Sequence, residues 1–163
     1  MNPIDPLMEF KKGLSALENG YSNVAVAHLQ KALEHDNYNP FYLSFYGLAL
    51  AMAEHDWARA EASCLAALRI KCNSARLYLN LAEVYRQAGE MEDALSTLYN
   101  GLQFTKWDSR LLQVLQQLGI RRTPVLSFLD RKNILNRQLG KLRHRLEGHS
   151  NVSTGERLRM GHS

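Results

Sequence analysis

The chain has 163 residues, 45% hydrophobic and 22% charged, which suffices for one folded domain and excludes wholesale disorder or a collagen-like chain. The net charge of +4 is unevenly distributed along the chain. Residues 1–108 hold nine basic and 13 acidic side chains, whereas residues 109–163 hold 11 basic and three acidic side chains. Two cysteines suggest a reducing compartment. The longest apolar stretch, 41–53, is too short for a membrane span, and residues 1–12 do not resemble a signal peptide. We therefore expect a soluble, cytoplasmic protein.

Capping residues and prolines mark where successive helices begin. Asp5-Pro6 and Asn39-Pro40 place a capping side chain before a proline at the first helical position, and Asp108 is a further expected cap. No segment alternates with period two for long enough to be a strand, so the predicted class is all-α. The predicted helices span residues 5–18, 22–36, 40–53, 57–70, 74–88, 91–104 and 109–118, followed by 124–130 (after Thr123-Pro124) and 134–146 (after Asn133).

A small–large–small stripe recurs at a fixed period. Its first copy is Ala25, Leu29 and Ala32, and the steps of four and three place all three residues on one helix face. The stripe returns after 34 or 35 residues, at Ala60, Cys64 and Ala67, and then at Ala94, Leu98 and Gly101. The small residues of this stripe, which we call notch residues, let the backbones of two helices approach closely. The pattern therefore predicts stacked helical hairpins, in which a large side chain at Ala60 or Ala94 costs about 1–3 kcal/mol.

The third unit carries the pattern most fully, at Tyr78, Leu81, Ala82, Tyr85, Gly89, Ala94, Leu98 and Gly101. It resembles the tetratricopeptide repeat, a helix–turn–helix unit of about 34 residues. The first unit departs from that family at Glu9 and Lys12, where bulky apolar residues are usual. The resemblance implies a right-handed α-solenoid of about three repeats with a capping helix over residues 5–118. Basic helices over 119–147 would cap or extend it, and a polar tail, 148–163, is predicted to be disordered.

In this family the first helices line a concave groove that holds an extended peptide or a partner helix. The residues carried over by phase are Leu7, Phe10, Leu14, Leu17, Phe41, Ser44, Leu48, Arg76, Leu79, Glu83, Arg86, Arg110 and Gln113. The groove is then apolar at its amino end and polar to basic at its carboxy end, which favours an apolar segment followed by acidic residues. Alternatively, the apolar residues of 5–18 pack against a neighbouring helix or a second copy of the chain.

One subtype of these repeats grips the terminal carboxylate of chaperones through Lys and Asn on the first two groove helices. Here the resemblance places Phe10, Leu14, Ser44 and Leu48 at those positions. The clamp residues are absent, so this ligand is not predicted.

The region after residue 118 is strongly basic. Its predicted surface consists of Arg121, Arg122, Arg131, Lys132, Arg137, Lys141 and Arg145, while Leu135, Leu139, Leu142 and Leu146 form an apolar stripe. The basic side chains are either a solvated helix face or a docking surface for an acidic protein, nucleic acid or an anionic membrane. Nucleic acid is less favoured because no aromatic residues interleave with the arginines. A membrane surface is less favoured because the leucine stripe lacks Trp and Phe.

No constellation of residues indicates catalysis, a metal or a cofactor. The six histidines lack zinc-protease spacing, and His28 and His35 are expected to face solvent. Cys64 and Cys72 form no CxxC motif, and we expect Cys64 to be buried and inert. The sequence therefore predicts a non-catalytic protein-interaction module, an adaptor or chaperone-like scaffold. The alternatives are a binder of an anionic partner through the basic helix, or a structural subunit or homodimer.

Overall fold

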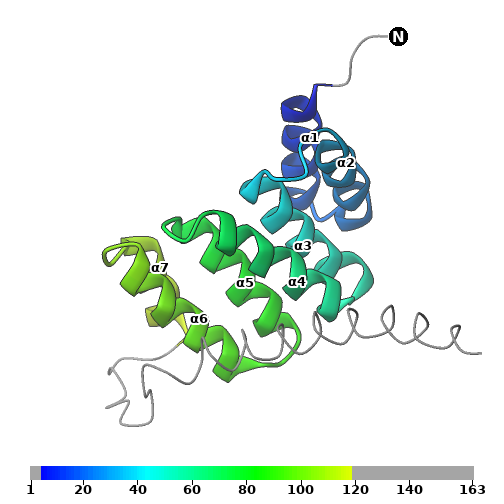
Figure 1. Cartoon of the computed structure of the whole chain (residues 1–163). Coiled ribbons are helices and arrows are strands. Elements are labelled where there is room, and N and C mark those ends of the chain that lie inside the picture. Colours follow the sequence, from blue (N-terminus) through cyan, green and yellow to red (C-terminus); the bar gives the residue numbers. More distant parts are fainter. Residues whose placement is uncertain (1–4, 119–163) are drawn as a thin grey trace, which may run out of the picture. The chain divides into compact units, whose positions relative to one another are not determined.

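A computed structural model describes residues 5–118, which belong to one unit of the chain, and these residues form seven helices and no strand (Figure 1). The seven predicted helices are confirmed, each end to within one residue. The predicted helices over 124–130 and 134–146 lie outside the described residues, as does the predicted tail. The helices are α1 Pro6–Glu18, α2 Ser22–His35, α3 Pro40–Glu54, α4 Trp57–Ile70, α5 Ala75–Gln87, α6 Met91–Phe104 and α7 Ser109–Gln117.

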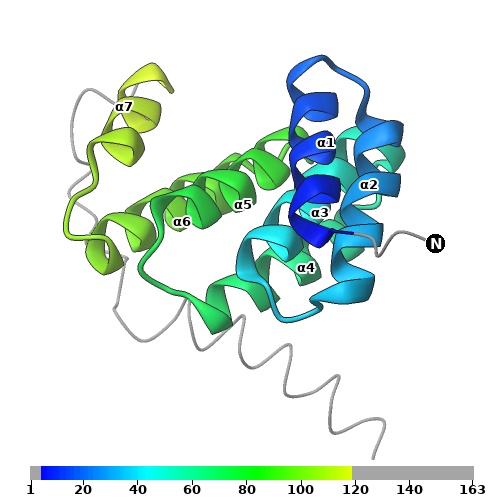
Figure 2. The same ribbon diagram turned by 90° about the horizontal axis from the view of Figure 1, so that it is seen from above.

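Each helix packs against the next, so that α1–α2, α3–α4 and α5–α6 form three successive hairpins (Figures 1 and 2). The first helices of the hairpins also contact one another in the order α1, α3, α5, and α7 contacts both α5 and α6. This is the all-α helical repeat expected from the recurring stripe. The helix α7 covers the last hairpin, as a repeat array requires at its end.

Side-chain caps start four of the helices. The Asp5 carboxylate accepts a hydrogen bond from a backbone N–H of α1 at 2.9 Å, and Asn39 accepts two from α3 at 3.1 and 3.4 Å. Asp108 caps α7 at 3.0 Å, so these three predicted caps are confirmed. Asp56 caps α4 at 3.1 Å and was not predicted. The predicted caps Thr123 and Asn133 lie outside the described residues.

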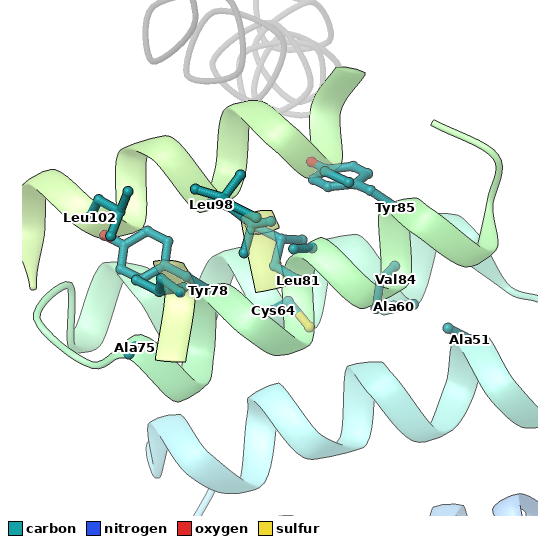
Figure 3. Close-up of a cluster of buried hydrophobic side chains, with 14 of the residues drawn as sticks. Ala51, Ala60, Cys64, Ala75, Tyr78, Leu81, Val84, Tyr85, Leu98 and Leu102 are labelled. Carbon is teal, nitrogen blue, oxygen red and sulfur yellow. The ribbon is translucent and has the colours of Figure 1, made fainter. Parts of the chain in front are cut away.

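The recurring stripe is buried in all three hairpins. Its alanines are each at most 1% exposed, and Leu29, Cys64 and Leu98 between them are fully buried. Figure 3 shows Ala60, Cys64 and Leu98 within one cluster of apolar side chains. A Cβ atom added to Gly47 would lie 2.6 Å from the Ala60 carbonyl oxygen. The small residues are therefore required where helices cross, as the sequence predicts.

The two cysteines are both free thiols with different surroundings. Cys64 is fully buried, and its Sγ donates to the Ser44 carbonyl oxygen at 3.4 Å. Burial raises the pKa of this thiol to about 12, so it stays protonated and unreactive near neutral pH. Cys72 is exposed, in the loop between α4 and α5. The prediction that Cys64 is buried is confirmed.

Candidate functional site

The candidate site is the exposed surface of α1, α3, α5 and α7, which we call the first-helix face. Its amino end, on α1, carries accessible apolar side chains beside the exposed Lys11. Leu7 is 49% exposed, and Phe10, Leu14 and Leu17 are each partly buried. The Phe10 ring lies 4.7 Å from the ring of Tyr42 and 5.6 Å from that of Phe45 on α3. The side chains of α1 therefore pack partly on α3 and still leave apolar surface in contact with solvent.

The middle of the face is built on α3 and is less accessible than predicted. Phe41 is partly buried, and the Lys71 ammonium lies 5.3 Å from its ring centroid, within the range of a cation–π contact. Leu48 is partly buried against the main core. Ser44 departs from the prediction because it is fully buried, and its hydroxyl accepts a hydrogen bond from Asn80 Nδ2 at 3.0 Å. Ser44 therefore joins α3 to α5 and does not line a surface.

On α5 the first and last of the four predicted residues are exposed, and the two between them are partly buried. Arg76 and Arg86 are exposed, while Leu79 and Glu83 are partly buried. Arg86 donates two hydrogen bonds of 2.7 Å to the Glu83 carboxylate, which also accepts one from Gln87 at 2.8 Å. The Arg86 guanidinium holds the pKa of Glu83 below its usual value. The charge of Arg86 is thus largely neutralised by Glu83 of the same helix.

At the carboxy end, Arg110 and Gln113 of α7 are exposed. Arg110 pairs with Asp108 at 2.7 Å, and hydrogen bonds from Arg110 lower the pKa of Asp108 to about 2. Among residues 5–118, no carboxylate forms an ion pair with Arg76. The face is therefore less basic at this end than the sequence suggests, and Arg76 is the exposed arginine of α5 that has no ion pair among these residues.

The predicted basic surface lies outside the described residues. This applies to all seven members, Arg121, Arg122, Arg131, Lys132, Arg137, Lys141 and Arg145. The docking interpretation of these residues stays a prediction.

An ion cluster inside the first hairpin was missed by the sequence reasoning. Glu9 is 8% exposed, and its carboxylate lies 2.7 Å from Lys12 Nζ and 2.7 Å from His28 Nδ1. The expectation that His28 faces solvent is therefore wrong, because its ring is turned to a carboxylate between α1 and α2. Hydrogen bonds from Lys12 and His28 lower the pKa of Glu9 to about 2. An acid at a position that should be apolar was the available signal for a buried partner.

Membrane-spanning helices and metal sites are two further features to consider in the described part of the chain. No helix within residues 5–118 has the length and apolar character needed to cross a bilayer. Within the same residues, no group of three or more His, Cys, Asp or Glu side chains is placed to hold a metal ion.

Comparisons with known proteins give a match in structure only. No family model and no curated protein matches the chain. The first tetratricopeptide repeat (TPR) domain of human RPAP3 matches with a TM-score of 0.59 at 18% identity, covering 70% of this chain and 89% of that one. The first TPR of Spaghetti (RPAP3), bound to the HSP90 peptide SRMEEVD, matches with a TM-score of 0.58 at 18% identity. The match covers 70% of this chain and 92% of that one.

MamA, another similar structure, has a TM-score of 0.57 at 18% identity, covering 91% of this chain and 81% of its own. At identities this low, the structural similarity establishes the fold but does not identify a ligand. The helical hairpins, their buried notches and these neighbours agree: the chain has a tetratricopeptide-repeat-like fold.

Proposed function

We propose that the chain is a non-catalytic protein-interaction module that binds a segment of a partner protein on the first-helix face. The bound segment is apolar where it meets α1 and acidic where it meets α5. The module acts as an adaptor or a chaperone-like scaffold, and its two free thiols suit the cytoplasm as the place of action.

The observation that carries the proposal is the arrangement of accessible side chains along this face. Leu7 is 49% exposed beside the partly exposed Phe10 and Leu14 of α1, which is unfavourable unless another apolar surface covers them. Arg76, with no ion-pair partner among residues 5–118, lies two hairpins further along. Apolar contacts on α1 and a cation on α5 therefore favour a segment whose apolar end lies at α1 and whose acidic end lies at α5.

The peptide bound to the Spaghetti domain supports the general mode of binding. That peptide, SRMEEVD, is short and ends in acidic residues around one valine. At the positions that the resemblance assigns to the carboxylate clamp, this chain has Phe10, Leu14, Ser44 and Leu48, of which Ser44 is buried. We therefore propose a ligand whose apolar part contributes more, and whose terminal carboxylate contributes less, than in SRMEEVD.

Three labelled peptides test the proposal by fluorescence anisotropy with the full chain. One has three leucines followed by three glutamates, the second has the reverse order, and the third is SRMEEVD. We expect the first to bind with a Kd on the order of micromolar. The other two should bind at least about 10-fold more weakly, which is a loss of about 1.4 kcal/mol.

A pair of double variants locates the binding surface. Leu7→Ser/Arg76→Glu alters two exposed side chains of the first-helix face, so it changes the surface without opening the core. Val24→Ser/Lys31→Glu is the matched control on α2, where both side chains are also exposed. The first variant should weaken binding by at least about 10-fold and the control by less than about 2-fold. Equal losses in the two variants would remove this face as the site.

A further inference from the structure

A cavity lies where the start of α4 meets the end of α5. It has a volume of about 220 Å³ and combines aromatic, apolar and carboxylate side chains. It is lined by Trp57, Ala58, Glu61, Val84, Tyr85, Ala88 and Glu90. Figure 3 shows Tyr85 and Val84 at this end of α5. Drug-sized ligands and cofactors occupy roughly 300–1,000 Å³, so the cavity suits a single side chain.

The electrostatic field in this cavity is negative. Glu61 Oε1 accepts a hydrogen bond of 2.7 Å from the Tyr85 hydroxyl, which holds the carboxylate in place. Burial raises the pKa of Tyr85, and the charges of Glu61, Asp93 and Glu90 raise it further. Glu61 and Glu90 both line the cavity, and Asp93 adds its charge to theirs at the Tyr85 hydroxyl.

The acidic groups lack a compensating cation in the described part of the chain. No ion pair within residues 5–118 involves Glu61, Glu90 or Asp93. Arg59, in the first turn of α4, is engaged elsewhere: it lies 3.5 Å from both Glu54 and Asp56 and donates to the Tyr46 hydroxyl at 2.9 Å. Glu90 precedes α6 and makes no side-chain cap.

Trp57 supplies a surface that distinguishes this cavity from a plain group of acids. Its side chain is partly buried at the cavity wall, and the His55 ring lies 5.3 Å away at 46°. The indole face attracts cations more strongly than the other aromatic rings do. A planar guanidinium can stack on an indole and donate hydrogen bonds to carboxylates at the same time, which an ammonium cannot.

We propose that this cavity binds an arginine side chain of a partner protein, with the guanidinium against Trp57 and hydrogen-bonded to Glu61 and Glu90. The residues that line this site are not among those predicted for the first-helix face, and the site does not depend on what that face binds. It gives the module a second recognition point, specific for a basic residue.

The test uses the full chain with Trp107→Phe. The sequence has two tryptophans, so this substitution leaves Trp57 as the single source of tryptophan emission. N-acetyl-arginine amide is titrated while the Trp57 emission is recorded. N-acetyl-citrulline amide is the matched ligand, since it has nearly the same shape and no charge. We expect a saturable change with arginine at a Kd on the order of 1 mM, and no saturation with citrulline over the same range.

Glu61→Gln/Glu90→Gln is the test variant, because glutamine at position 61 keeps an oxygen that can accept from Tyr85. Glu18→Gln/Glu34→Gln is the control, with both side chains exposed on α1 and α2. The test variant should raise the Kd at least about 10-fold while the control leaves it unchanged. Circular dichroism verifies that both variants are folded. Equal response to arginine and citrulline, or unchanged affinity in the test variant, would overturn the proposal.

Discussion

The two junctions between hairpins are built differently. At the first junction α2 packs on α3, while α1 touches α3 sparsely, through aromatic contacts of Phe10 with Tyr42 and Phe45. At the second junction α3 and α5 pack extensively, and the Ser44 hydroxyl and Asn80 amide join them at 3.0 Å. Large aromatic rings between α1 and α3 keep the two helices apart, whereas small and hydrogen-bonded side chains allow α3 and α5 to pack closely.

This difference decides which part of the first-helix face is open. Leu7 at the first junction is 49% exposed, whereas Ser44 at the second junction is fully buried. A buried hydroxyl and amide are stable only when paired, so the second junction has little freedom to rearrange. The first junction therefore offers surface for a ligand, and the second provides the rigid support. Three substitutions and one pH dependence test how the junctions, the hairpins and the turns are stabilised.

Gly47→Ala should have the largest effect on stability. The new Cβ atom would lie 2.6 Å from the Ala60 carbonyl oxygen and 2.7 Å from Cys64 Sγ, so backbone must shift. We expect a loss of about 3 kcal/mol in the free energy of unfolding, measured with urea. Gly13→Ala in the first hairpin is the comparison, since the three atoms nearest to its Cβ all belong to the Leu29 side chain, the first at 2.7 Å. It should cost less because a side chain moves aside more readily than backbone does, and equal costs would contradict this difference.

Asn80→Ala should cost about 2 kcal/mol, because it leaves the Ser44 hydroxyl buried without its partner. The double variant Ser44→Ala/Asn80→Ala removes both polar groups. It should be no less stable than Asn80→Ala alone, apart from the lost volume. Urea unfolding of the two single variants and the double variant gives the coupling energy. A coupling energy of zero would show that the hydrogen bond does not support the second junction.

Lys106→Gly should stabilise the protein by about 0.5–1 kcal/mol. Lys106 has φ 54° in the turn after α6, whereas the turns after α1 and α5 use Gly20 and Gly89, at φ 78° and 82°. Glycine adopts this left-handed conformation without strain, although it also gains entropy in the unfolded chain. Thermal unfolding monitors the change, and Lys106→Ala controls for the loss of charge. A glycine variant less stable than the alanine variant would contradict the assignment of strain.

The smallest expected effect is on the pH dependence of the first hairpin. The pKa of Glu9 is about 2 in the folded chain against an ordinary value of 4.5. Between these values the unfolded chain binds more protons at this site than the folded chain does. The stabilisation is therefore complete above about pH 4.5 and is lost as the pH falls toward 2.

Hydrogen exchange of α1 and α2 from pH 3 to 6 measures this loss in the wild type and in Glu9→Gln. The variant should show a flatter profile in these two helices. Asp108 has a similarly low pKa at α7, and its local effect should persist in the variant. An unchanged profile in α1 and α2 would show that the Glu9 cluster adds no pH-dependent stability.

Much of the fold follows from local patterns that are visible in the sequence. Capping residues and prolines locate the helix starts, as at Asp5 and Asn39, because the unpaired N–H groups of a first turn need a nearby acceptor. The notch residues, such as Ala60, locate the helix crossings because only small side chains fit there.

The candidate site was less predictable. Repeat phase assigned Ser44 to the surface, but the closeness of α3 and α5 buries it. The ion pairs of Arg86 with Glu83 and of Arg110 with Asp108 depend on rotamers, so a count of arginines overstated the charge of the face. The cavity at the start of α4 brings together Trp57 and Glu90, residues of two hairpins, and no local pattern connects them.

The amino-acid sequence by itself determined the helices, their order and the small residues at which they meet, because these depend on interactions within one turn or at a fixed repeat. The tertiary structure alone decided how far apart the first helices lie, and therefore which side chains remain accessible. Helix separation is set by the combined volume of side chains from two hairpins, which no single segment contains.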